Sequence, residues 1–589
     1  MNPVFLSELQ EKINGLEPEK KTGIRLLVWV NEKDEYRTLD FQLPVKELLE
    51  QEYGLYRNYL LAMMNNLLVS FGGAKLVIYH EKEDGLDDLI QDAISEFHAE
   101  APRNDRTGYG VYLNYINRMN TFLGLGRFSF EVHPLEEYPR LLPEKEYRIY
   151  IPGDEQQEKE LLRRSARELS GTCICSLDVG GNSIKGAVVK DGRIAVLKEY
   201  CWYPTGCKVA EEMNDPMILM VRFLSACTGL LERDGDLEGA RAALEKTVPY
   251  GELLKATEAL EAEGIVTEGR FDSVVAGFPD IVVHNKIAGG ESFKHQGLKN
   301  NPDTDYEIEF FRTSDLDEML APYAKAGAPV VVLNDGNAAS YITSVEQAFA
   351  EESILDENGL FANTIGTEMG TGFISRGGTI QHIPLEGFQH VIDLGNEEYK
   401  RYPASDIRSV NSTNTGIPGV VQKYISQMGL FRMAITWMYE HQDPMFEELQ
   451  EKGLLSFDRE SDKMTAVLEP KDRRGELTRF LVSLLEQRHP AVVYAYETMG
   501  KAMGILIDQD RLIFPEIAPV RLLSGGIIAD NRACELLRKG LKEYNSGYEV
   551  IRLDEETMYS PLLKSMKPEE RNFNVAIGSA YIGNRFLIQ

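Results

Sequence analysis

The hydrophobic pattern from residue 171 onward consists of apolar runs that each end at a glycine-bearing turn. The five runs and turns are Cys173–Val179 with Gly180-Gly181, Ser273–Ala276 with Gly277-Phe278-Pro279, Val330–Leu333 with Asn334-Asp335-Gly336, Thr364-Ile365 with Gly366–Gly372, and Val520–Leu523 with Ser524-Gly525-Gly526. Short apolar runs bounded by turn residues predict buried β-strands, and stretches between them have helical spacing. This order of elements predicts an α/β fold.

Residues 1–169 have another pattern, and we expect them to form a separate α+β domain. Strands are expected at 23–30, 75–79, 127–133 and 146–151, and helices at 45–70, 86–98 and 154–169. This stretch carries no motif with an evident chemistry. It is either an interaction or regulatory domain or structural packing, and the sequence does not choose between these roles.

The composition is typical of a globular protein, and the net charge argues against two classes of partner. The chain has 589 residues, of which 43% are hydrophobic, and a formal net charge of −30. This charge repels phosphate backbones and anionic lipids at long range, so we expect neither nucleic acid nor membrane as a partner. No stretch has the ~18 apolar residues that cross a bilayer, and the first residues do not resemble a secretory signal.

Six cysteines without a Cys-x-x-Cys pair predict no disulfide framework. Cys173 and Cys175 fall on one face of an expected strand and are interpreted as small buried hydrophobic residues. A reducing, cytoplasmic location is therefore expected.

The first glycine turn joins two expected strands into a β-hairpin that can bind phosphate. Gly180-Gly181 lets backbone N–H groups approach an anion without obstruction by a Cβ. Asn182, Ser183 and Lys185 add hydrogen-bond donors and positive charge. Asp178, at the end of the first strand, is placed to hold a hydrated Mg²⁺.

Asp335 lies between the end of a buried-type strand and the start of a helix. One interpretation is a helix N-cap, a role for which Asp is well suited. The other is a general base, which accepts the proton of a hydroxyl while its oxygen attacks phosphorus. Asn334 and Asn337 beside it can hydrogen-bond the hydroxyls of a polyol.

The two remaining turns suggest contacts with a nucleotide. The polar and glycine positions of 366–372 predict a nest of backbone N–H groups between two strands. At Gly525-Gly526 the missing side chains would let the backbone pass close to a flat purine ring.

In this order the motifs resemble those of sugar kinases of the actin-like ATPase superfamily, and within it the ROK family (repressor, open reading frame, kinase). The matching segments are DVGGNSIKGAVV at 178–189, LNDGNAAS at 333–340, IGTEMGTGF at 365–373, GKAMGILIDQDRLIFPE at 500–516, LSGGIIADN at 523–531 and FNVAIGSAYIG at 573–583. The resemblance covers residues 171–589 and leaves 1–169 unassigned.

The resemblance implies two ribonuclease-H-like lobes with ATP and sugar in the cleft between them. One lobe would comprise 171–332 with 572–589, and the other 333–571. The implied activity is ATP-dependent phosphorylation of a hexose or N-acylated hexose hydroxyl, with Asp335 as the catalytic base. ATP and phosphate contacts would be Asp178 (through Mg²⁺ and water), Gly180, Gly181, Asn182, Ser183, Lys185, Gly366, Thr367, Gly370, Thr371, Gly525 and Gly526. Sugar contacts would be Asn334, Asn337, Glu386 and His390.

Several positions depart from the family pattern. Glu368 replaces a usual Gly, and a carboxylate beside a triphosphate costs free energy unless a cation intervenes or the carboxylate points away. Asn182 replaces a usual Thr. Glu386 and His390 are four apart instead of three, so His390 is either a sugar contact or a structural histidine. The family's cysteine-rich zinc motif is missing, and we expect no zinc site.

Other features bear on assembly and on DNA binding. Residues 1–169 are too long and too acidic for the winged helix of repressor members, so DNA binding is not expected. Additional helical segments are expected at 211–260 and 421–487. The apolar stretch 431–438 is interpreted as core or as subunit contact, and a homodimer is possible.

Three functions are compatible with these residues. The first is an ATP-dependent sugar kinase. The second is a non-catalytic sugar- or nucleotide-binding regulator on the same scaffold, motivated by Glu368 and the altered sugar motif. The third is another actin-like ATPase, which usually lacks the Asn-Asp-x-Asn-Ala-Ala string at 334–339.

Overall fold

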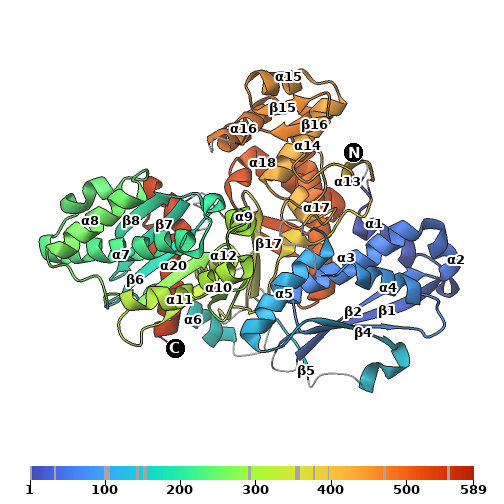
Figure 1. The fold of residues 1–589 in the computed structure, drawn as a ribbon, viewed down its shortest axis with the longest axis horizontal. Helices are drawn as coiled ribbons and strands as arrows, with labels where there is room; N and C mark the ends of the chain where they lie inside the picture. Colours follow the sequence, from blue (N-terminus) through green and yellow to red (C-terminus); the bar gives the residue numbers. More distant parts are fainter. Residues whose placement is uncertain are drawn as a thin grey trace. The chain divides into compact units, whose positions relative to one another are not determined.

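The structure, a computed structural model, divides the chain into two compact units (Figure 1). Unit 1 comprises residues 1–148, 363–371 and 384–552, and unit 2 comprises 149–362, 372–383 and 553–589. The described residues are 3–31, 35–98, 107–140, 145–149, 155–181, 183–289, 293–351, 359–375, 378–395, 397–468, 472–553 and 558–588.

Unit 2 is built on a five-stranded sheet in the order β12-β9-β6-β7-β8. Its strands are β6 (Cys173–Val179), β7 (Ser183–Lys190), β8 (Arg193–Cys201), β9 (Ser273–Phe278) and β12 (Val330–Asn334). β6, β7 and β8 are antiparallel, whereas β9 pairs in parallel with β6 and β12 in parallel with β9. An antiparallel three-stranded meander continued by two parallel strands is the ribonuclease-H-like arrangement that was expected.

Helices cover both faces of this sheet because the side chains of its strands alternate between faces. On β6, Cys175 and Leu177 belong to the apolar cluster that includes Met220 of α7. Ser176 points the other way and donates a hydrogen bond to the Ala576 carbonyl of α20. Cys173 and Cys175 are both buried and unpaired, which confirms their interpretation as small hydrophobic residues. The principal helices of unit 2 are α6 (Glu155–Arg167), α7 (Ala210–Asp234), α8 (Tyr250–Ala262), α9 (Gln296–Asn300), α10 (Tyr306–Ser314), α11 (Leu316–Leu320), α12 (Asp335–Phe349), α19 (Pro561–Lys564) and α20 (Asn574–Leu587).

The N-terminal part of unit 1 contains a five-stranded sheet in the order β4-β3-β1-β2-β5. Its strands are β1 (Lys21–Trp29), β2 (Glu35–Pro44), β3 (Lys75–His80), β4 (Ser129–Pro134) and β5 (Lys145–Glu146), and its principal helices are α1 (Leu6–Asn14), α3 (Tyr53–Phe71), α4 (Asp87–Ser95) and α5 (Tyr109–Leu123). The structure thus adds β2, α1 and α5 to the expected elements. Of the expected strand at 146–151, only Glu146 lies in a strand, residues 147–149 are not strand, and residues 150 and 151 lie outside the described residues.

The remainder of unit 1 contains strands of a second sheet, ordered β14-β13-β17-β18. The elements are β13 (Gly359–Ile365), β14 (Met369–Ser375), β17 (Val520–Ser524), β18 (Glu549–Arg552), α14 (Gln427–Glu440), α15 (Pro444–Glu451), α16 (Asp472–Ser483), α17 (Pro490–Ile513) and α18 (Asn531–Tyr544). The β13–β14 hairpin is divided between the units, and its turn belongs to unit 1. The additional helical segments expected at 421–487 are present as α14, α15 and α16, but the structure adds an antiparallel hairpin between them, formed by β15 (Leu455–Asp458) and β16 (Lys463–Ala466).

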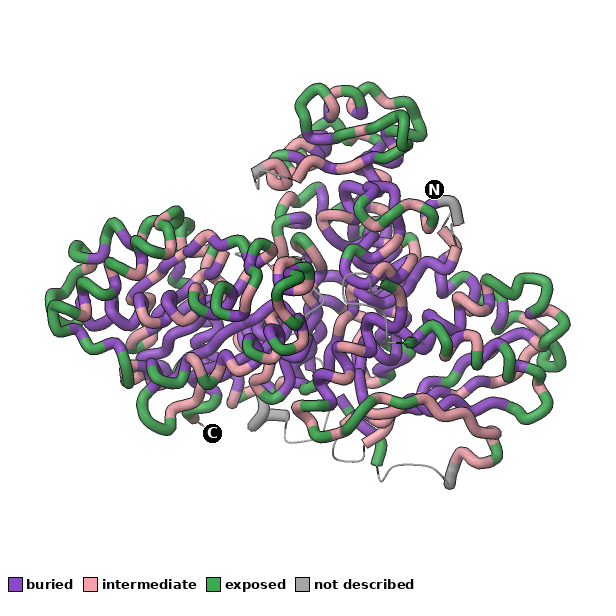
Figure 2. The backbone as a smooth tube through the Cα atoms, viewed as in Figure 1, coloured by how far each residue is buried: buried purple, intermediate pink, exposed green. Residues whose placement is uncertain are grey.

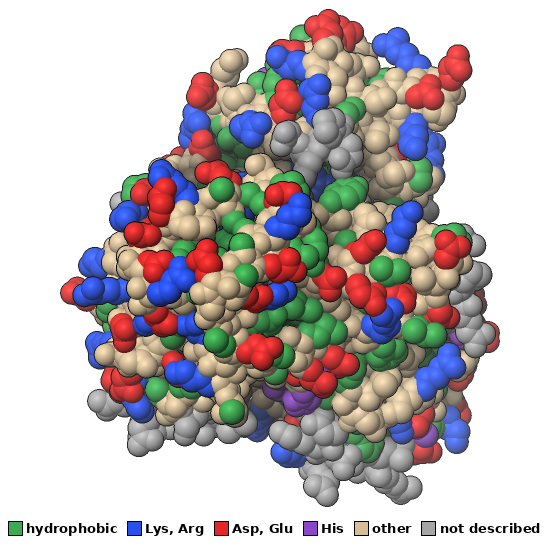
Figure 3. Space-filling view, turned by 60° about the vertical axis from the view of Figure 1, so that its left-hand side comes forward, with side chains coloured by type: hydrophobic (Ala, Val, Ile, Leu, Met, Phe, Trp, Pro, Cys, Tyr) green, Lys and Arg blue, Asp and Glu red, His purple; other side chains and the backbone are tan. Residues whose placement is uncertain are grey.

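Burial follows these layers (Figure 2). Buried residues run along the strands of the unit 2 sheet and along α17, and exposed residues gather on outer turns. Phe431, Met433 and Met438 of α14 are fully buried in unit 1, so the stretch 431–438 belongs to the core. Figure 3 shows acidic and basic side chains interspersed over the face that it presents. Within the described residues, no helix has the length and hydropathy needed to cross a bilayer.

Arg37 joins the N-terminal sheet to the end of α17 within unit 1. Its side chain is 3% exposed and donates to both carboxylate oxygens of Glu516, to the Ile513 carbonyl and to the Tyr147 carbonyl. Phe71 of α3 packs on Phe514 beside it, with ring centroids 4.8 Å apart. Residues 1–148 therefore share a packed interface with the C-terminal half of unit 1. The predicted three-domain boundaries stay a prediction.

We expect Arg37→Ala to lower the free energy of unfolding by about 3 kcal/mol, because removing one partner leaves buried polar groups unpaired. The matched control is Arg25→Ala on the neighbouring strand, whose ion pair with Asp40 is largely exposed. Its expected cost is below about 1 kcal/mol. Urea denaturation measures both, and equal costs would contradict the assignment of Arg37 as an interface residue.

Candidate functional site

Asp178 and Asp335, two of the predicted site residues, both lie at the carboxyl edge of the unit 2 sheet. Asp178 on β6 is in register with Gly277 on β9, and Gly277 is in register with Leu333 on β12. A Cβ at Gly277 would lie 3.9 Å from the Asp335 Cα. Because glycine has no side chain, Gly277 leaves space between Asp178 and Asp335. Ligands of α/β sheets bind at this edge.

Asn334, and not Asp335, is the N-cap of helix α12. The Asn334 side-chain oxygen accepts hydrogen bonds from the backbone N–H groups of Gly336 and Asn337, at 2.8 and 3.3 Å. Its Nδ2 donates to the Asp280 carbonyl at 2.8 Å. Asp335 is the first helical residue, is half-buried, and accepts the Gly336 N–H with one oxygen. The capping role that one interpretation gave to Asp335 thus belongs chiefly to its neighbour.

Asn337 lines a cavity of about 200 Å³ within unit 2. Asn334, His284, Asn285, His382 and Arg585 also contribute to its lining. Asn337 is 4% exposed, and its side-chain oxygen accepts no hydrogen bond from the described part of the chain. A buried acceptor of this kind is satisfied when a hydroxyl or amide donor enters.

The first glycine turn lies at the same edge. The Gly180 N–H donates to the Ser183 carbonyl at 2.9 Å and closes the turn. Lys185 lies opposite Asp178 in the β6–β7 register. Burial raises the pKa of Asp178, and the positive charge of Lys185 opposes this shift. Asn182, also predicted to bind phosphate, lies outside the described residues.

The structure adds Lys294 to this turn. A Cβ at Gly181 would lie 3.3 Å from the Lys294 Cε, and the Lys294 ammonium donates to the Pro279 carbonyl at 3.2 Å. Sequence reasoning missed Lys294 because it stands more than a hundred residues from the turn in a loop without a motif. Trp202 was missed as well, and its indole N–H donates to the Gly180 carbonyl at 2.8 Å.

In unit 1, the predicted second phosphate turn and the predicted adenosine turn are adjacent. The Gly366 N–H donates to the Glu368 carbonyl, and Thr367 between them is exposed. Gly525 has a φ of +113°, and a Cβ on it would lie 2.2 Å from the Ile365 carbonyl oxygen. Only glycine fits this approach. Gly526 has open space around its Cα, as a site for a flat ring requires.

The carboxylate of Glu368 is held by side-chain amides of the same unit. Asn414 and Gln422 each donate to its Oε1, both at 2.9 Å. Gln422 in turn accepts the Thr413 N–H. The Glu368 carboxylate, which replaces the usual glycine of the family pattern, is therefore stabilised by two side-chain amide donors. The side chain fastens the turn to the segment 413–422.

Glu386 and His390 differ in their access to solvent. Glu386 is half-buried, whereas His390 is 1% exposed. The His390 Nε2 lies 3.0 Å from the Ser70 Oγ, and its Nδ1 lies 3.8 Å from an Asp510 oxygen. Burial lowers the pKa of His390 to about 3, so the ring is neutral at pH 7. In this arrangement both ring nitrogens face protein groups. Sugar contact by His390 stays a prediction.

The predicted site residues thus form two groups. Asp178, Gly180, Gly181, Ser183, Lys185, Asn334, Asp335 and Asn337 belong to unit 2, and Gly366, Thr367, Gly370, Thr371, Glu386, His390, Gly525 and Gly526 belong to unit 1. Within unit 1, Gly387 connects the Glu386 segment to the phosphate turn, since a Cβ on it would lie 2.8 Å from the Thr371 Oγ1.

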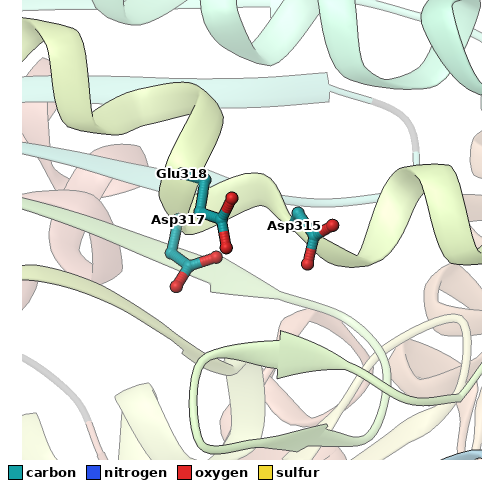
Figure 4. A group of neighbouring side chains, drawn as sticks. All are labelled: Asp315, Asp317 and Glu318. Carbon is teal, nitrogen blue, oxygen red and sulfur yellow. The ribbon is translucent and has the colours of Figure 1, made fainter.

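An acidic cluster elsewhere in unit 2 is engaged with a lysine. Asp315, Asp317 and Glu318 lie at the start of α11 and bring their carboxylates together (Figure 4). The Lys286 ammonium lies 2.9–3.0 Å from an oxygen of each. These three residues are the one cluster in the described ranges with the geometry of metal ligands. Because the Lys286 ammonium already forms an ion pair with each of these carboxylates, we assign no metal to the cluster.

Known structures provide the following comparisons. The chain is similar to a ROK-family glucokinase from Streptomyces griseus solved with glucose and AMPPNP, with 16% identity over 70% of this chain and 98% of that one and a TM-score of 0.36. It is similar to a ROK hexokinase from Thermus thermophilus, with 16% identity, coverage of 71% and 98%, and a TM-score of 0.37. It is also similar to a glucokinase from Balamuthia mandrillaris in complex with glucose, with 14% identity over 73% of this chain and 98% of that one and a TM-score of 0.39. No protein-family model and no curated protein sequence matches the chain.

We expect Glu368→Ala to lower the free energy of unfolding by about 2–3 kcal/mol, because two amide donors lose a charged acceptor. Glu368→Gln retains an acceptor oxygen and should cost less. Glu460→Ala, at an exposed turn, is the control and should stay within about 0.5 kcal/mol of wild type. If urea denaturation finds Glu368→Ala as mild as the control, the amide contacts do not hold the turn.

We expect His390 to make the protein less stable in acid. Its pKa is about 3 in the folded chain and about 6.5 in the unfolded chain, so between these values the unfolded state binds the additional proton. From pH 7 to pH 5 this lowers the free energy of unfolding by about 2 kcal/mol. His390→Gln should lose this component, as urea titrations at the two pH values will measure. Equal pH dependence in both proteins would contradict the neutral buried ring.

Proposed function

We propose that the protein is an ATP-dependent sugar kinase that phosphorylates a hydroxyl of a hexose or N-acylated hexose. The observation that carries the proposal is that Asn334, and not Asp335, caps α12, which leaves the Asp335 carboxylate without the capping role. Asn334 caps the helix, and Asp335 lies beside Gly277, which is in register with Asp178 at the carboxyl edge of the sheet. The ordered series of glycine turns in the sequence supports the same activity.

The reaction needs a general base for the acceptor hydroxyl and donors that bind the phosphates. Asp335 would accept the proton of the acceptor hydroxyl while the hydroxyl oxygen forms a bond to the γ-phosphorus. The bond from that phosphorus to the oxygen bridging to the β-phosphate breaks, and ADP leaves with the electron pair. Backbone N–H groups at the turns of 180–183 and 366–371 would bind phosphate oxygens. Lys185 and Lys294 place positive charge at the first turn.

Asp178 is the residue that would hold Mg²⁺, through water. Mg²⁺ keeps several waters and commonly binds through one or two carboxylates together with substrate phosphates. A single carboxylate whose pKa is raised by burial fits this mode, since a nearby cation would stabilise its charged form. The ion would supply neutralisation of phosphate charge.

The sugar would be recognised by side chains that can form hydrogen bonds with its hydroxyls. Asn337 lines a cavity and has an unsatisfied buried oxygen. Glu386 is half-buried on the segment that follows Leu385. Asn334 already uses its oxygen for two backbone donors and one of its amide hydrogens for Asp280. Its remaining amide hydrogen is what it could offer to a hydroxyl.

A second candidate is a non-catalytic sugar- or nucleotide-binding regulator. The burial of His390 favours it, because a predicted sugar contact is directed to the protein interior. Calorimetric titration combined with an assay for ADP separates the two functions. The regulator binds a ligand but releases no ADP from ATP with any hexose or amino sugar.

We expect Asp335→Asn to lower kcat by about 10²–10⁴-fold, because the general base is lost while hydrogen bonding and shape are retained. Binding of ATP and sugar, measured by calorimetry, should change little. The matched control is Asp305→Asn, which alters the N-cap of α10, where Asn is an equally good cap. Its kcat should equal that of wild type. Unchanged turnover in Asp335→Asn would remove Asp335 from the mechanism.

A further inference from the structure

Helix α3 of the N-terminal part is buried on nearly all sides and carries two asparagines in its centre. Asn65 and Asn66 are each 0% exposed. A helix that is apolar all round must be covered on every face, and buried amides need partners for their donors and acceptors. The two asparagines therefore indicate a specific partner on the covered side of α3.

The partner is the segment 385–394, which carries the predicted sugar residues. Asn66 accepts the Val391 N–H at 2.7 Å and donates to the Val391 carbonyl at 3.1 Å. Asn65 donates to the Gln389 carbonyl at 2.9 Å, and Asn58 of the same helix donates to the Leu394 carbonyl at 3.3 Å. These side-chain amides form hydrogen bonds with the backbone of the segment, as the backbone of a neighbouring strand would.

The carboxyl end of α3 binds the beginning of the same segment. The Leu385 N–H donates to the Ser70 carbonyl and the Glu386 N–H to the Val69 carbonyl. These carbonyls belong to the last turn of the helix, where no partner exists within the helix itself. Leu385 has a φ of +50°, a left-handed conformation that is uncommon for a bulky residue and requires support. The helix end provides that support.

The opposite side of the segment connects to the phosphate turn. The Gln389 side-chain oxygen accepts hydrogen bonds from the Ser412 and Thr415 hydroxyls. The segment 413–422 that follows holds Glu368 through Asn414 and Gln422. A continuous set of polar contacts thus runs from α3 to the turn at 366–371, all within unit 1.

We propose that the N-terminal residues 1–148 act as the positioning element for the sugar-binding segment 385–394, with Asn66 as the central positioning residue. The proposal rests on the proposed function and extends it by giving these residues a role. Helix α3 fixes the backbone that carries Glu386 before the sugar arrives. Less conformational entropy is then lost on binding. Asn66 touches neither substrate in this role and acts only through the segment.

The test uses the full chain with Asn66→Ala, which removes both hydrogen bonds to Val391. The KM for the sugar that is turned over should rise by about tenfold or more, because one buried pairing is worth roughly a factor of ten. The KM for ATP should rise much less, because Asn66 reaches the phosphate turn only through Gln389 and the segment 413–422. Asn120→Ala is the matched control: a fully buried asparagine of α5 that donates to the Gly73 carbonyl inside the N-terminal part. It should leave both KM values unchanged.

Hydrogen–deuterium exchange of the peptide covering 385–394 provides a readout that does not require activity. Its amides should exchange about tenfold faster or more in Asn66→Ala than in wild type or Asn120→Ala. Equal exchange in the two variants, or a parallel rise in the KM for ATP, overturns the positioning role. A wild-type chain that turns over no sugar refutes the proposed function alone, since the exchange experiment still reports on the segment.

Discussion

The Asn334 side chain is the N-cap of helix α12, because its amide oxygen accepts hydrogen bonds from two free N–H groups at the helix start. The neighbouring Asp335 carboxylate is therefore not required as the cap. By bonding Gly336 and Asn337 on one side and the Asp280 carbonyl on the other, Asn334 ties two neighbouring strand ends together. The same principle recurs through the chain. At two other places a side-chain amide completes the hydrogen bonding of a backbone segment. Asn285 does so along the edge of β12, and Asn65 and Asn66 along 389–391.

Much of the architecture of unit 2 could be predicted from the sequence, since its strands are apolar runs closed by glycine turns. β6, β7, β9 and β12 all fall where such runs occur, and their glycines have visible reasons. Gly277 lies beside Asp335, where a Cβ would contact the Asp335 Cα at 3.9 Å. In unit 1, Gly525 adopts a conformation and a close approach that a Cβ would forbid. Short-range pattern was sufficient to find these strands because each apolar run and the glycine turn that closes it are adjacent in the sequence.

The features that sequence reasoning missed depend on pairings between distant residues. Lys294 reaches the first turn from another loop, and the side chain of His390 is enclosed by Ser70 and Asp510, which no spacing rule connects to it. The hairpin at 455–466 was masked by the helical spacing of the sequence around it. The role of Glu368 was also undecidable from sequence, since its donors Asn414 and Gln422 lie more than forty residues away. Burial and partner identity are tertiary properties, and local periodicity does not encode them.

The contacts of α3 have a consequence for how the chain is made. Asn65 and the carbonyl that it binds are separated by 324 positions, so on a ribosome this helix emerges about 16–65 s before its partner does. During that interval the side-chain amides of Asn65 and Asn66 do not have the backbone partners that they bind in the folded chain. The hydrogen bonds that join α3 to the segment 385–394 can therefore form only after translation has passed residue 394.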